Sequence, residues 1–116
     1  MDPVHVSPRM FRNFWQEYRV YADRLELEFR LGFKTIVIPF EEILSVEIRP
    51  PLVVGDLFRG KDLKFALALK LDSADMYQHI AVTRKNGMFK NIRFTPGDPE
   101  SFLSILQERM AQHSGR

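Results

Sequence analysis

Alternation of apolar and polar residues constrains this chain more than any other feature of its sequence. In the segment 25–31, leucine or phenylalanine stands at every odd position and a charged residue at every even position. A second segment, 64–71, alternates in the same way between large apolar residues and lysine or alanine. Because successive side chains of a β-strand point to opposite faces, both segments are typical of strands with one buried face. The sequence therefore predicts a mainly β protein.

Other segments extend this interpretation along the chain. The strands predicted, seven in all, cover residues 19–21, 25–31, 35–40, 43–49, 64–71, 77–84 and 88–95. Asn86-Gly87 predicts a two-residue type I′ hairpin before the last strand. Asp98 and Pro99 predict the start of a helix, as N-cap and first helical residue, and its apolar side continues to Met110. This order predicts a partly open antiparallel barrel of two orthogonal sheets, capped by one C-terminal α-helix.

The 116 residues have the length of one domain. Residues 1–18 are expected to be a loose N-terminal arm that holds a short helix, because aromatic residues recur there at helical spacing. Phe14 and Trp15 are interpreted as satellite core on this arm. Residues 19–112 are expected to form the folded domain, and residues 113–116 a frayed tail.

The element order and three segments resemble the pleckstrin-homology-like (PH-like) superfold, specifically its bacterial branch. The segments are YRVYADRLEL at 18–27, IPFEEILSVE at 38–47 and IRFTPGDPESFL at 92–103. They are similar to the opening hairpin of that family, its strand with an acidic step, and its last strand with the start of the helix. The resemblance spans about residues 19–110. It implies a PH-like domain, and such domains bind phosphoinositides, peptides or copies of themselves.

The charges argue against two classes of ligand. The resemblance places phosphoinositide ligands at Arg19 and Arg24, but this hairpin is short and carries Asp23. A phosphate cradle needs several convergent donors, so specific headgroup recognition is not expected. The net charge of +2 is low for a nucleic-acid binder, and no nucleic-acid partner is expected.

Two groups of residues are candidate contact surfaces. The irregular stretch 52–62 contains large apolar residues that either fold back over the sheet or contact a protein or a second copy. These are Leu52, Val53, Val54, Leu57 and Phe58. The other group is basic and would face an anionic membrane or an acidic partner, or else form a solvated sheet face. It consists of Arg84, Lys85, Lys90 and Arg93.

Residues for catalysis or metal binding are few. The histidines His5, His79 and His113 are scattered, and the sequence has no zinc spacing, serine elbow or Gly-rich phosphate loop. No enzyme activity, metal or cofactor is therefore expected. The lack of cysteine, of a long apolar run and of a signal-like start predicts a cytoplasmic protein.

Together these observations predict a non-catalytic interaction module whose partner is another protein or a second copy. One alternative is a peripheral adaptor that is held to anionic membrane by the basic residues near position 90. The other alternative is a small-molecule-binding barrel, which requires a deep, dry pocket.

Overall fold

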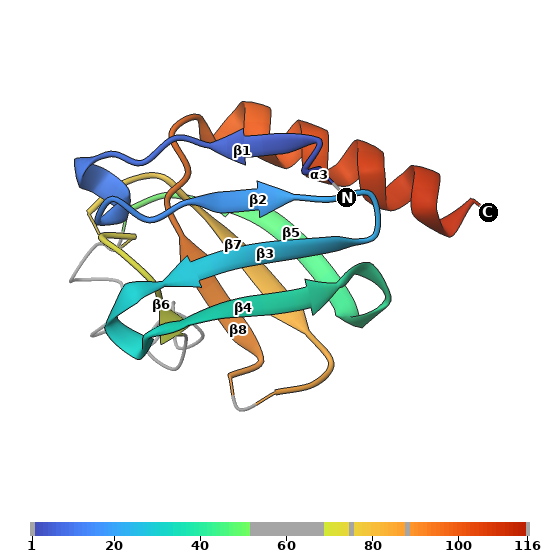
Figure 1. Cartoon of the computed structure of the whole chain (residues 1–116), viewed down its shortest axis with the longest axis horizontal. Helices are drawn as coiled ribbons and strands as arrows, with labels where there is room; N and C mark the ends of the chain where they lie inside the picture. The colour runs from blue at the N-terminus through green and yellow to red at the C-terminus, as the bar shows by residue number, and fades with distance from the viewer. Residues whose placement is uncertain (1, 52–68, 75, 88, 116) are drawn as a thin grey trace.

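The computed structural model describes residues 2–51, 69–74, 76–87 and 89–115. In this part of the chain the strands form two four-stranded sheets, and one α-helix follows them at the C-terminal end (Figure 1). The predictions of a mainly β fold and of a C-terminal helix are confirmed. The strand count differs from the expected seven, because the described residues form eight strands in two separate sheets.

The first sheet is an antiparallel meander with the order β1-β2-β3-β4. Its strands are β1 (His5–Ser7), β2 (Tyr18–Val20), β3 (Arg24–Phe29) and β4 (Lys34–Pro39). Three 3-10 turns accompany them: η1 (Phe11–Asn13), η2 (Arg30–Gly32) and η3 (Phe40–Glu42).

The alternation of apolar and polar residues determines which side chains of this sheet are buried, as the sequence predicts. Leu25 and Leu27 of β3 are fully buried, while Glu26 between them is partly exposed on the other face. Ile38 and Ile36 of β4 stand opposite Leu25 and Leu27 and are also buried. The inward face therefore consists of branched apolar side chains that pair across neighbouring strands.

The N-terminal arm belongs to this sheet, so the expected loose arm is wrong. His5 of β1 stands opposite Val20 of β2. The helical structure between β1 and β2 is the single turn η1. The Asn13 side chain holds this turn by accepting a hydrogen bond from Met10 N–H at 2.8 Å and donating one to Pro8 O at 2.9 Å.

The second sheet has the order β5-β7-β8-β6. Its strands are β5 (Ile43–Arg49), β6 (Leu69–Lys70), β7 (His79–Arg84) and β8 (Asn91–Phe94). β7 is antiparallel to β5 and β8, whereas β6 is parallel to β8. The expected simple meander is wrong here, because β8 lies between β6 and β7 and the segment that joins β6 to β7 is not a hairpin turn.

The β7–β8 hairpin is confirmed, but its connection is longer than the predicted type I′ turn. Arg84 N–H donates to Lys90 O at 2.8 Å across the base of the loop. Among the described loop residues, only Gly87 has a positive φ, 104°. The Arg84 side chain donates to Phe89 O at 2.8 Å, and Lys90 Nζ donates to Lys85 O at 2.6 Å. These side-chain hydrogen bonds stabilise the wider loop.

The C-terminal helix α3 (Pro99–Ser114) begins as predicted, with Asp98 as N-cap and Pro99 in the first turn. Asp98 Oδ1 accepts a hydrogen bond from Ser101 N–H at 3.2 Å. The helix continues to Ser114, two residues into the predicted tail 113–116. Within the described part of the chain, no helix combines the length and the apolar character needed to cross a bilayer.

The two sheets and α3 share one hydrophobic core. In Figure 1 the strands of the second sheet run obliquely behind those of the first, and α3 lies beside β1. The buried members of the core are Tyr18, Val20, Leu25, Leu27, Ile36, Ile38, Phe40, Ile43, Leu71, Ile80, Val82, Ile92, Phe94, Phe102 and Leu106.

Candidate interaction surface

The predicted apolar contact residues Leu52, Val53, Val54, Leu57 and Phe58 lie outside the described residues. Their role as a partner surface stays a prediction.

The predicted basic surface is only partly assembled. Arg84, Lys85 and Lys90 lie at the β7–β8 hairpin and are exposed or half-exposed. Arg93 is only 1% exposed, and its Nε donates to Asn91 Oδ1 at 3.0 Å. Its predicted place on a solvated face is wrong, because β8 is an inner strand of its sheet and is covered on both faces.

The two arginines that the resemblance places at a phosphoinositide site, one in β2 and one in β3, are paired with carboxylates. Arg19 Nη1 lies 2.6 Å from Glu17 Oε2, and Arg24 Nε lies 2.6 Å from Glu26 Oε2. The Arg24 guanidinium also lies 3.9 Å from the centre of the Tyr21 ring. These contacts occupy donors that a bound phosphate would need.

Asp72 is the centre of a buried polar network that joins the two sheets. Its carboxylate accepts hydrogen bonds from the Tyr18 hydroxyl, from Thr95 Oγ1 at 2.8 Å and from Thr95 N–H at 2.7 Å. Gln16 is fully buried, and its Nε2 donates to the Tyr18 hydroxyl at 3.0 Å and to Leu71 O at 2.9 Å. Sequence reasoning missed this network, because Asp72 begins a segment with the composition of a turn.

Burial raises the pKa of the Asp72 carboxyl to about 6, although hydrogen bonds from Tyr18, Thr95 and the Ala74 N–H act in the opposite direction. A raised carboxyl pKa can mark a general acid. Asp72 is only 6% exposed, however, and its oxygens bind groups of the protein itself. The network therefore stabilises the contact between the sheets. Among the described residues, no group of histidine and carboxylate side chains could hold a metal ion.

The raised pKa predicts a pH-dependent stability. Because the folded protein keeps the Asp72 proton to a higher pH than the unfolded chain, protonation favours the folded state. This contribution is complete below pH 3.8 and is lost as the pH rises through about 6. At about 1.4 kcal/mol per pKa unit, the loss is about 3 kcal/mol. Urea unfolding at a series of pH values measures it, and Asp72→Asn should lack it. Equal pH profiles for the two proteins would contradict the prediction.

Four exposed aromatic side chains form the surface that we call the aromatic end. They are Phe11, 74% exposed, Phe14, 44%, Trp15, 54%, and Phe33, 95%. They belong to the β1–β2 loop and the β3–β4 turn, which an antiparallel meander places at the same end of the sheet (left in Figure 1). The interpretation of Phe14 and Trp15 as satellite core is wrong, because both side chains are exposed. They follow the 3-10 turn η1 and do not belong to an amphipathic helix.

Three of these aromatic residues have a left-handed backbone. The φ angles are 56° at Phe14, 59° at Trp15 and 53° at Phe33, and they are the positive values at non-glycine residues in the described chain. Phe14 and Phe33 each follow a 3-10 turn and donate their N–H to its first residue, Phe11 O at 3.1 Å and Arg30 O at 3.0 Å. Glycine or asparagine usually occupies such a position, because a Cβ is disfavoured there by about 1–2 kcal/mol.

Hydrogen bonds brace the two loops of the aromatic end against each other. Gln16 Oε1 accepts from Arg30 N–H at 2.7 Å. Arg9 donates to Trp15 O at 3.1 Å and to Glu28 Oε2 at 3.2 Å. Burial alone would raise the pKa of Glu28, but the hydrogen bonds from Arg9 and a backbone N–H bring it below its ordinary value. The polar side chains of this end bind to one another and to the backbone, whereas the aromatic side chains are exposed.

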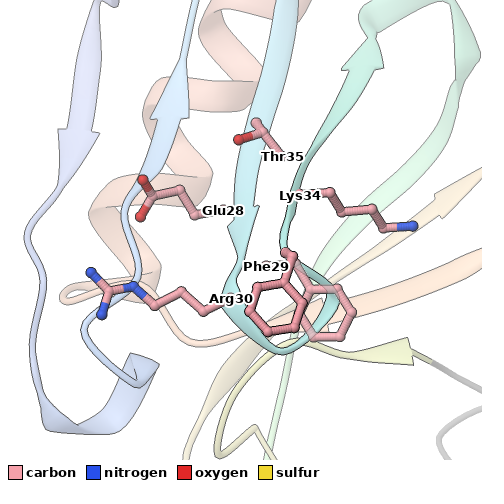
Figure 2. Close-up of a pocket in the computed structure, with 6 residues that line it drawn as sticks. Glu28, Phe29, Arg30, Lys34 and Thr35 are labelled. Carbon is pink, nitrogen blue, oxygen red and sulfur yellow. The ribbon is translucent and has the colours of Figure 1, made fainter.

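An open groove of about 620 Å³ lies at the β3–β4 turn, lined by Glu28, Phe29, Arg30, Phe33, Lys34 and Thr35 (Figure 2). Arg30 and Lys34 extend to opposite sides of the turn, with Phe29 between them. A Cβ at Gly32 would lie 2.6 Å from the Phe29 ring, so any other residue there would displace this ring. A second open groove, of about 490 Å³, lies between η3 and the end of α3. Neither has the enclosed form that a small-molecule barrel requires.

One feature of the sequence could have indicated the aromatic end. Phe33 stands in the predicted turn 32–34, although turns favour glycine, proline, asparagine, aspartate and serine. No family model, curated protein or solved structure matches this chain. The aromatic end is therefore described from the structure of this chain alone.

Proposed function

We propose that this chain is a non-catalytic interaction module and that the aromatic end is the surface that contacts its partner. One observation carries the proposal: Phe33 is 95% exposed and has a positive φ. Its ring gains almost no burial, while its backbone conformation is strained. Strain that folding does not require is typical of functional positions.

A PH-like fold is part of this proposal. The meander of β2, β3 and β4, the β7–β8 hairpin and a C-terminal helix over a shared core support it. β1 is an addition to the expected pattern. β6 belongs to the predicted strand 64–71, whose residues 64–68 lie outside the described residues, but it is parallel to β8 where an antiparallel strand was expected.

Exposed aromatic residues suit two kinds of partner. Protein interfaces are enriched in tryptophan, phenylalanine and arginine, so another protein or a second copy fits the aromatic end. Aromatic side chains also lie at membrane–water interfaces, which fits a peripheral adaptor. The sequence favours a protein partner, whereas the charges around Phe33 favour a membrane.

The proposal predicts that Phe33→Asn stabilises the folded protein by about 0.5–1 kcal/mol, because asparagine tolerates the left-handed backbone better. Urea unfolding measures this change. Phe29→Asn is the matched control, because Phe29 lies in the same turn region but packs against the core. It should destabilise the protein by about 1–3 kcal/mol. A loss of more than about 1 kcal/mol in Phe33→Asn would show that Phe33 is structural and would remove the basis of the proposal.

A further inference from the structure

We infer that the aromatic end docks on the interfacial layer of an anionic membrane. The inference rests on the proposed function and names the partner of the same surface. It does not involve Arg24 of the β2–β3 hairpin, which lies at the opposite end of the meander.

Two cations flank the most exposed aromatic ring. Arg30 is the first residue of η2 and Lys34 the first residue of β4, so the two lie on either side of Phe33 in the sequence, and both are exposed. Their side chains extend to opposite sides of the turn that contains Phe33 (Figure 2). Within the described chain, neither forms an ion pair with a carboxylate. Basic residues beside an anionic membrane add to its attraction, and they leave the aromatic ring between them free to enter the interface.

The acidic groups near the aromatic end are already neutralised. Glu28 is bound by Arg9 at 3.2 Å, and Glu17 is bound by Arg19 at 2.6 Å. These carboxylates therefore repel an anionic surface less than free ones would. With the acids paired, Arg30 and Lys34 determine the sign of the charge beside Phe33.

The aromatic end is also preorganised. Its two loops are closed by 3-10 turns and joined by the hydrogen bond from Arg30 N–H to Gln16 Oε1 at 2.7 Å. Phe11 and Trp15 of one loop and Phe33 of the other can therefore contact a surface with little loss of conformational entropy. A projecting aromatic group with flanking cations matches the membrane interface, where aromatic rings lie at headgroup level.

Binding to vesicles tests the inference directly. The full chain is mixed with vesicles of phosphatidylcholine alone and of phosphatidylcholine with phosphatidylglycerol in equal parts. We expect cosedimentation with the anionic vesicles and weaker binding as salt rises. Trp15 is the only tryptophan, so its emission reports on this end alone. The emission should shift to shorter wavelength on binding and be quenched by lipids brominated near the headgroup.

Charge-reversal variants locate the contact. Arg30→Glu with Lys34→Glu should weaken binding to anionic vesicles by about tenfold or more. Lys85→Glu with Lys90→Glu makes the same change of charge at the β7–β8 hairpin and should leave binding within about twofold. Phe33→Ser should weaken binding by about tenfold, and its exposed position makes a loss of fold unexpected.

Three outcomes would overturn the inference. The first is no binding of the wild-type chain to anionic vesicles at low salt. The second is bound protein whose Trp15 emission does not shift. The third is loss of binding in the hairpin variant while the Arg30 and Lys34 variant still binds. If vesicles do not bind but sedimentation shows self-association that Phe33→Ser abolishes, the membrane inference falls and the proposed function stands.

Discussion

Replacing Asp72 by alanine is expected to lower the free energy of unfolding by about 3–5 kcal/mol. The Asp72 carboxylate accepts hydrogen bonds from Tyr18 in the first sheet and from the Thr95 hydroxyl and N–H after the last strand. Alanine leaves these donors buried without their acceptor, and each such group costs about 1–3 kcal/mol. Urea unfolding at neutral pH, with the slope of the transition compared between variants, measures the loss.

Two partner variants separate the network from simple packing. Tyr18→Phe and Thr95→Val each remove one donor to the Asp72 carboxylate and keep most of the side-chain volume. Each should destabilise the protein by about 1–2 kcal/mol, less than Asp72→Ala. In a double-mutant cycle, Tyr18→Phe should cost little in the Asp72→Ala background, because its partner is already absent. A loss below about 1 kcal/mol for Asp72→Ala would mean that the network does not join the sheets.

Phe102→Ala is expected to destabilise the protein by about 3–5 kcal/mol, the usual range for removing a buried phenylalanine ring. Phe102 is fully buried on α3. Its ring centre lies 5.5 Å from that of Phe94 in β8 and 5.5 Å from that of His5 in β1. The ring therefore contacts both sheets, and alanine leaves a cavity where helix and sheets meet. Chemical unfolding measures the effect, and hydrogen exchange should show faster opening of β1.

Ser104→Ala is the matched control for the helix. Ser104 lies two residues further along α3 and is exposed. Its replacement should change the free energy of unfolding by less than about 0.5 kcal/mol. If Phe102→Ala also cost less than about 1.5 kcal/mol, α3 would not belong to the cooperative core that its contacts indicate.

The candidate site shows where prediction from the sequence failed. The aromatic spacing from Met10 to Tyr18 suggested a helix with an inward stripe, but the Asn13 side chain binds the backbone at Met10 and Pro8 and holds a 3-10 turn. Trp15 consequently lies outside, while Gln16 enters the interior and binds Leu71 O. Spacing alone could not reveal this, because these polar partners compete with helix formation.

The local sequence pattern also could not predict which charged residues are buried. The sequence predicts Arg93 as one member of a basic surface and Asp72 as a turn residue. Both are buried because β8 lies between β6 and β7, a pairing between segments that are distant in the sequence. Strand pairing of this kind depends on which apolar faces meet, and short-range periodicity contains no information about that.

The sequence alone determined the local features of this protein. The inward faces of β3 and β4 follow from side-chain alternation, and the start of α3 follows from Asp98 and Pro99. The tertiary structure decided the order of the second sheet, the Asp72 network and the exposure of Phe33. The reason is that alternation and capping involve neighbouring residues, whereas what covers a side chain depends on segments that meet only in the folded chain.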